Sequence, residues 1–185
     1  KSARRDLSEV VAWRRSQHAF STVKIALGFP CALELHAAYG SAEIKAALGL
    51  ASLERSGSAG VGVLHAEHLK CYVHLVTFRK SDEDFSPTTQ YRDYPISRTE
   101  LHWESQSGTS RASPAGQNLL HFHERGYTIL FFARLEKRIE DETAPFLFLG
   151  QAKRLISAQG DRPIAIVWEL EHPMPAALFE EARAI

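Results

Sequence analysis

Residues 85–106 read F-S-P-T-T-Q-Y-R-D-Y-P-I-S-R-T-E-L-H-W-E-S-Q, and the end of this stretch alternates between polar and apolar side chains. Successive side chains of a β-strand point to opposite faces, so a strand over residues 96–106 places Leu101 and Trp103 together on one face. The opposite face then carries four polar side chains, which we call the polar stripe: Glu100, His102, Glu104 and Gln106. This stripe makes the stretch the first place to look for a function.

The segments around this stretch predict an α+β fold. Short apolar or alternating runs predict strands over 62–65, 70–78, 127–135, 146–149, 153–157 and 163–170. Helical periodicity and capping residues predict helices over 3–17, 41–48, 114–125 and 176–184. We expect a mostly antiparallel sheet or small barrel, with a helical N-terminal part and one long inserted helix. Residues 1–40 are predicted to form a helical appendage and residues 41–185 a β-rich domain, together one compact unit.

Composition limits the classes of function. The chain has 185 residues, 44% of them hydrophobic, and its 22 Lys and Arg balance its 22 Asp and Glu. A nucleic-acid partner must therefore be recognised through local patches and not through net charge. Cys31 and Cys71 are far apart, which argues against a disulfide scaffold or zinc ribbon. No apolar run has the length of a membrane span, so we expect a cytoplasmic protein, and the start at Lys1 suggests a domain cut from a longer polypeptide.

Basic and aromatic residues interleave around the polar stripe, which favours DNA binding. Arg and Lys side chains hold phosphates, aromatic rings stack on bases, and amides or carboxylates bond to base edges. Tyr94 or Trp103 with Glu104 or Gln106 is a candidate pocket for a flipped, modified base. The full set of candidate DNA-binding residues is Arg79, Lys80, Tyr91, Arg92, Asp93, Tyr94, Arg98, His102, Trp103, Glu104, Gln106, Arg111 and Ser113. Ser113 belongs to this set because it caps a helix whose free amides attract anions.

Three alternative roles for these residues stay open. Asp93, Glu104 and Gln106 faintly resemble the D…E-x-K site of metal-dependent nucleases, which would require Mg²⁺. In a second alternative, the domain is a protein-protein docking module, and its neutral net charge fits that role. The stretch is alternatively a structural loop whose side chains bond to the backbone. Zinc is a weaker idea, because His121 and His123 diverge on a helix and His65 and His68 have no Cys pair nearby.

Several ordered motifs resemble a known family. They are L-H-A-A-Y-G-S-A-E-I-K-A-A-L-G from residue 35, G-V-L-H from 62, F-S-P-T-T-Q-Y-R-D-Y-P-I-S from 85, E-L-H-W-E-S-Q-S from 100, A-P-F-L-F-L-G from 144 and P-I-A-I-V-W-E-L-E-H-P-M-P from 163. The chain resembles, over residues 35–175, an uncharacterised domain at the C-terminal end of bacterial superfamily-two (DEAD/DEAH-type) helicases, some fused to phospholipase-D-type nucleases. The resemblance implies a bacterial nucleic-acid-processing or defence context. The chain has no helicase motifs, so no ATP hydrolysis is implied.

Taken together, the sequence predicts a binding module that is not an enzyme by itself. We expect it to bind DNA, including modified DNA, for a helicase or nuclease domain of the same or a partner protein in a restriction or antiviral defence system. No cofactor is expected, except Mg²⁺ under the nuclease alternative.

Overall fold

The computed structural model describes residues 22–50, 62–79, 93–139 and 142–184. The helix predicted over residues 3–17 lies outside these ranges. Residues 22–40, the described part of the predicted helical appendage, form short strands instead of a helix. The division at residue 40 stays a prediction, although Leu27, Leu33 and Leu35 of this segment are buried.

The described elements confirm an α+β fold in which strands predominate. The strands are β1 (Val23–Lys24), β2 (Glu34–Leu35), β3 (Ala38–Tyr39), β4 (Val63–Ala66), β5 (Cys71–Thr77), β6 (Tyr94–Pro95), β7 (Glu100–Glu104), β8 (Thr128–Arg134), β9 (Arg138–Ile139), β10 (Glu142–Thr143), β11 (Phe146–Gln159) and β12 (Ala165–Leu170). The helices are α2 (Ser41–Ala47), the 3₁₀ turn η2 (Glu67–Leu69), α3 (Pro114–Leu120) and α4 (Ala176–Arg183).

The main sheet has the strand order β4-β5-β8-β11-β12-β7-β6, with β3 also paired to β11. Its pairs are antiparallel apart from β5 and β8, which run parallel. Parallel neighbours need a long crossover, and residues 78–127 provide it, with β6, β7 and α3 inside it. Within the described residues β4 and β6 do not pair, so the sheet is open. The predicted mostly antiparallel sheet is confirmed, and the alternative of a small barrel is wrong.

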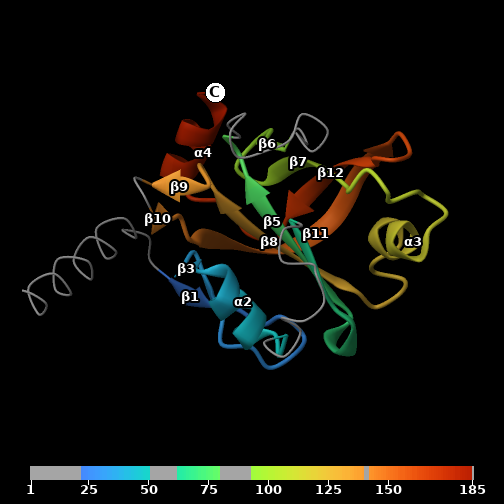
Figure 1. Cartoon of the computed structure of the whole chain (residues 1–185), viewed down its shortest axis with the longest axis horizontal. Coiled ribbons are helices and arrows are strands. Elements are labelled where there is room, and N and C mark those ends of the chain that lie inside the picture. The colour runs from blue at the N-terminus through green and yellow to red at the C-terminus, as the bar shows by residue number, and fades with distance from the viewer. Residues whose placement is uncertain (1–21, 51–61, 80–92, 140–141, 185) are drawn as a thin grey trace, which may run out of the picture.

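Apolar side chains pack on both faces of this sheet. One cluster joins β5, β7, β8 and β12 to α3 and α4, with Phe131 and Trp168 at its centre. A second cluster lies on the other face of β5 and β8, where Ile44 and Leu48 from α2 and its C-terminal end cover it. Figure 1 shows α2 below the sheet, α3 at the right and α4 at the upper left.

The predicted long inserted helix is shorter than expected. α3 begins after Ser113, whose hydroxyl accepts a hydrogen bond from the Gly116 amide at 3.1 Å. It ends at Leu120, and turns occupy residues 121–126 up to Gly126, which has a φ of +70°. The predicted terminal helix is confirmed as α4. None of the described helices is long and apolar enough to cross a membrane.

Candidate nucleic-acid interface

Three residues of the polar stripe, Glu100, His102 and Glu104, lie on β7, which forms a hairpin with β6. Leu101 and Trp103 are 0% and 4% exposed, whereas Glu100, His102 and Glu104 are half-buried on the opposite face. The predicted alternation is therefore confirmed. The amides of Ile96 and Ser97 both donate to the Glu100 carbonyl, at 2.8 and 3.2 Å, and these bonds close the hairpin turn.

An aromatic stack stands on the outer face of the hairpin. Tyr94 and His102 are directly opposite each other in the β6–β7 pairing, so their side chains share one face. Their ring centroids lie 4.6 Å apart and the planes differ by 9°. Tyr94 is 46% exposed, which leaves a large part of this residue available to a partner.

The acidic residues next to this stack are partly used by the fold. The Asp93 carboxylate accepts a hydrogen bond from the Glu104 amide at 3.1 Å, which holds the start of β6 against the end of β7. Ser105 then turns to the core, where its hydroxyl accepts the Ile164 amide at 2.9 Å. Gln106 follows beyond the strand and is half-buried.

The neighbouring strands add both charges to the same face. Val167 pairs with His102, and Glu169 pairs with Glu100. Lys153 donates to Glu169 at 2.7 Å, and Arg154 also bonds to that carboxylate. These two bonds hold the pKa of Glu169 below its ordinary value. The outer face is therefore mixed in charge and not a basic patch.

Trp103 is not on this face. It stacks on His74 of β5, with ring centroids 3.9 Å apart and planes 5° apart, inside the apolar core. The interpretation of Trp103 as a ring that stacks on a ligand base is therefore not supported by its position. His74 is fully buried, and burial lowers its pKa to about 3. Neither of its ring nitrogens nor Nε1 of the adjacent Trp168 has a hydrogen-bond partner among the described residues.

The predicted basic residues are distributed over three regions. Arg79 pairs with Glu136 at 3.1 Å and donates to the Glu181 carbonyl at 2.9 Å, so it attaches β5 to α4. Arg111 lies beside the β11–β12 turn, where its amide donates to Asp161 at 2.6 Å and its guanidinium reaches the Gly160 carbonyl. Ser113 lies close by and caps α3. The predicted site residues Lys80, Tyr91 and Arg92 lie outside the described residues.

Arg98 belongs to a basic group at the hairpin turn, which we call the tip cluster: His36, Arg98 and His172. Arg98 is exposed, and its Nε donates to the Met174 carbonyl at 2.8 Å while the Met174 amide donates back at 2.7 Å. Burial lowers the pKa of His36, and a hydrogen bond that its ring donates to the Pro173 carbonyl raises it. Nearby His172 and Arg98 lower the same pKa further, so the net shift is downward. Sequence reasoning missed this cluster because its members come from three separate segments.

Three of the four histidines considered for zinc, His65, His121 and His123, have other contacts. His121 bonds to Glu124 at 3.1 Å, and His123 bonds to the Lys153 carbonyl at 2.7 Å. His65 stacks on Tyr72, with ring centroids 4.2 Å apart. Across the residues that the structure describes, no three His, Cys, Asp or Glu side chains are grouped closely enough to hold a metal ion.

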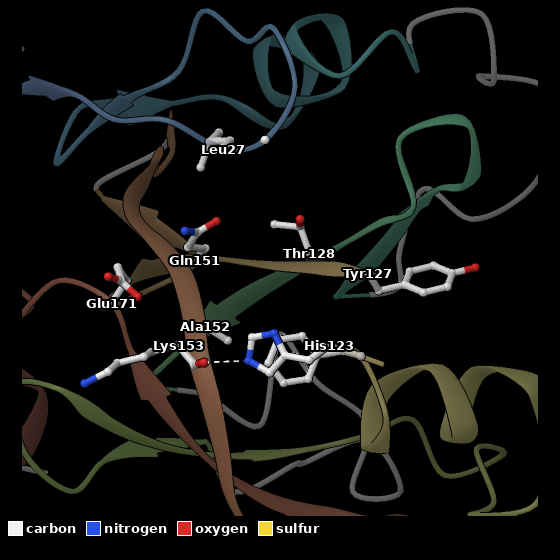
Figure 2. Close-up of a pocket in the computed structure, with 10 residues that line it drawn as sticks. Leu27, His123, Tyr127, Thr128, Gln151, Ala152, Lys153 and Glu171 are labelled. Carbon is white, nitrogen blue, oxygen red and sulfur yellow. Dashed lines mark hydrogen bonds between the residues drawn. The ribbon is translucent and has the colours of Figure 1, made fainter. Parts of the chain in front are cut away.

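A separate cavity of about 310 Å³, which we call the β8–β11 cleft, lies between residues 27–28, the turn after α3, and β11. Figure 2 shows Thr128 and Gln151 between Leu27 and the His123 ring, with Glu171 on the other side of β11 and the Tyr127 ring pointing away. The lining residues are Leu27, Gly28, Phe122, His123, Tyr127, Thr128, Gln151, Ala152, Lys153 and Glu171. No motif in the sequence indicated this cleft.

A family model described as "Domain of unknown function (DUF3427)" matches residues 33–182. The chain belongs to this family. The DUF3427 match includes the polar stripe, the tip cluster and Arg111. It also includes the cleft residues Thr128, Gln151 and Glu171. The predicted family resemblance is confirmed as membership of DUF3427, whereas the helicase and nuclease context stays a prediction.

Comparison with other proteins adds little to the DUF3427 assignment. No curated protein matches the sequence. Among solved structures, the chain is similar to the "DNA recognition domain of the cytosine modification-dependent restriction endonuclease LpnPI", with 11% sequence identity and a TM-score of 0.37 over 84% of this chain and 76% of that chain. This TM-score is too low to carry an argument about fold or function.

Proposed function

We propose that this domain binds DNA on the outer face of the β6–β7 hairpin. The observation that carries the proposal is the exposed aromatic stack of Tyr94 on His102. Stacking of a base on an aromatic side chain contributes about 1–3 kcal/mol and does not depend on a particular base. His102 supports the Tyr94 ring from behind, so a base stacking on Tyr94 meets a ring that is already positioned.

The tip cluster supports the proposal by supplying positive charge beside the stack. Arg98 lies in the hairpin turn, within a few residues of both Tyr94 and His102. Its guanidinium is exposed and is held at Nε by the Met174 carbonyl, which leaves its terminal nitrogens to donate to a phosphate. The His172 imidazole lies close to the same point. Phosphate contacts of this kind position the DNA, whereas base contacts specify its sequence.

The wider role follows from the family resemblance. We place the domain as an accessory, non-catalytic DNA reader that serves a helicase or nuclease domain in a bacterial restriction or defence system. Modified DNA is included because half-buried Glu104, on the same face of β7 as His102, and Gln106 beyond the strand carry groups that bond to base edges. A cytoplasmic location is proposed on the same grounds.

Binding of the chain to plain and base-modified duplexes, measured by fluorescence anisotropy at low salt, tests the proposal. Tyr94→Ala is expected to weaken binding roughly tenfold or more, the loss of one stacked base. Ile139→Ala, which removes an exposed apolar side chain from β9, is the control and should bind like wild type. Arg98→Ala is expected to reduce the slope of log K against log salt by about one.

Two results would contradict DNA binding at the hairpin. One is an absence of binding to either duplex at low salt. The other is equal binding by the Tyr94→Ala and Ile139→Ala variants.

Protein docking is a second candidate for the same surface. Tyr94 and Ile96 are exposed by 46% and 45% at one edge of the sheet, and the net charge of the chain is zero. An interface core of this kind is rich in aromatic and apolar groups. If the domain docks onto a motor and does not bind DNA, its binding to that partner will be nearly independent of salt, in contrast to the steep salt dependence of phosphate contacts.

The nuclease alternative with Asp93, Glu104 and Gln106 stays a prediction. The hydrogen bond that the Asp93 carboxylate accepts from the Glu104 amide gives this carboxylate a structural role at the hairpin. Cleavage of plasmid DNA in the presence of Mg²⁺ or Mn²⁺, abolished by Glu104→Gln, would support this alternative over a binding module.

A further inference from the structure

The β8–β11 cleft exists because β11 changes partners. β11 pairs with β8 up to Gln151, which lies opposite Leu130, and from Ala152 onward it pairs with β12. Thr128, at the start of β8, consequently has no β11 partner, and the two strands diverge at this end of their pairing. The cavity of about 310 Å³ lies at this separation.

Three polar side chains at the cleft are not used by the described part of the fold. Gln151 and Thr128 are half-buried, and Glu171 is exposed. The Gln151 carbonyl accepts the Glu171 amide at 2.9 Å, which brings these two residues together. Their side chains, and that of Thr128, make no hydrogen bond or ion pair with any described residue. They offer a carboxylate, an amide and a hydroxyl, which together present both donors and acceptors.

The cleft also has a fixed ring. The Lys153 carbonyl can only accept, so Nε2 of His123 carries the hydrogen and donates at 2.7 Å. The His123 ring also packs on buried Phe122, with ring centroids 3.9 Å apart. The imidazole is therefore held in one position with its exposed side toward solvent. Figure 2 shows this ring beside Ala152 and below Thr128.

We propose that the β8–β11 cleft binds one unpaired nucleobase, with His123 as the stacking surface and Gln151, Glu171 and Thr128 on the edge of the base. A stacking ring combined with an amide and a carboxylate is the arrangement that enzymes and readers use for extruded bases. The volume is at the small end of the range of roughly 300–1,000 Å³ for ligand sites, which suits a single ring system better than a peptide. The inference rests on the proposal that the domain binds DNA.

The carboxylate defines which bases fit best. An ionised Glu171 only accepts hydrogen bonds, so it selects an exocyclic amino group, as in cytosine, adenine or guanine. The Gln151 amide both donates and accepts, so it complements the neighbouring ring nitrogen or carbonyl of the base. Thymine lacks the amino group and is expected to bind least well.

Two DNA probes of the same sequence test the cleft, one fully paired and one with a single bulged cytosine. Wild type is expected to bind the bulged duplex about tenfold more tightly than the paired duplex. Gln151→Leu and Glu171→Gln each lower this ratio toward one. Gln151→Leu removes a hydrogen bond, and Glu171→Gln replaces a charge-assisted hydrogen bond by a weaker neutral one, each worth several-fold in affinity. A bulged thymine in place of cytosine should give a smaller preference in wild type.

Glu142→Gln is the matched control, since it neutralises an exposed carboxylate on β10, which is not among the elements that line the cleft. The Gln151 side-chain amide gives an independent readout, because its nitrogen-15 NMR signal should shift with the bulged duplex and not with the paired one. A ratio near one in wild type, or a ratio unchanged in both cleft variants, overturns the inference.

The two proposals fail in different ways. If paired DNA binds and Tyr94→Ala weakens it, while the bulge has no effect, only the cleft assignment is wrong. If neither duplex binds at low salt, the proposed DNA binding is wrong and the cleft assignment is overturned with it.

Discussion

His74 is a titratable residue that is fully buried in the apolar core. It lies in the core between Trp103 and Phe131, and burial lowers its pKa to about 3. In the unfolded chain a histidine titrates near 6.5. The unfolded state therefore binds a proton that the folded state excludes between these two values, and stability falls as the pH falls through that window.

A His74→Phe variant measures this effect. The free energy of unfolding of wild type should drop by about 2 kcal/mol more than that of His74→Phe between pH 7 and pH 5, because phenylalanine has no proton to take up. Urea titrations at the two pH values give both numbers. Equal drops in the two proteins would show that His74 does not remain neutral in the folded state.

Single residues also mark how far the sequence predicts the site. The alternation through Leu101 and Trp103 was predicted because a strand has a period of two. That rule assigns a face to a side chain but not its contacts. The stack of Trp103 on His74, and of Tyr94 on His102, joins residues from different strands, so the sequence alone gave no reason to pair them.

At the scale of elements, α3 depends on one glycine. A Cβ at Gly116 would lie 2.0 Å from the Ser110 carbonyl oxygen and 2.9 Å from the Ser110 carbonyl carbon. Gly116→Ala is therefore expected to destabilise the fold by about 1–3 kcal/mol through overpacking, although alanine is the better helix former. A lower midpoint in urea denaturation is the expected result.

Gly108→Ala is the control for that variant. Gly108 precedes the same helix, and a Cβ at this position would meet nothing within 4 Å. It should leave the urea midpoint within experimental error of wild type. If Gly116→Ala behaves in the same way as Gly108→Ala, α3 does not pack directly on the backbone of Ser110.

Strand boundaries show which elements local sequence can predict. The strands near 63–66, 71–77, 128–134 and 165–170 were predicted from alternating or continuous apolar residues. β11 was predicted as two strands because Gly150 and the polar residues after it interrupt the pattern. In the structure, β11 is one continuous strand with register shifts, because its first half pairs with β8 and its second half with β12.

At the scale of the whole molecule, long-range pairing was the part that local patterns did not predict. The mostly antiparallel sheet expected from short strands with tight connections is found, but the parallel pairing of β5 with β8 around a crossover of some fifty residues was not predicted. The cleft follows from that topology and from the change of partner along β11. No single segment contains enough of its lining to give a local signal.

β7 also has consequences for how the chain is made. Its described partners are β6, which is next to it in sequence, and β12, which is synthesised much later. During synthesis, the edge of β7 that pairs with β12 therefore has no hydrogen-bonding partner until residues 165–170 have been made. An open edge of this kind is prone to pair with other chains. A chain that stops before residue 165 should accordingly aggregate instead of folding, and the surface around Tyr94 is completed only after residues 165–170 have been synthesised.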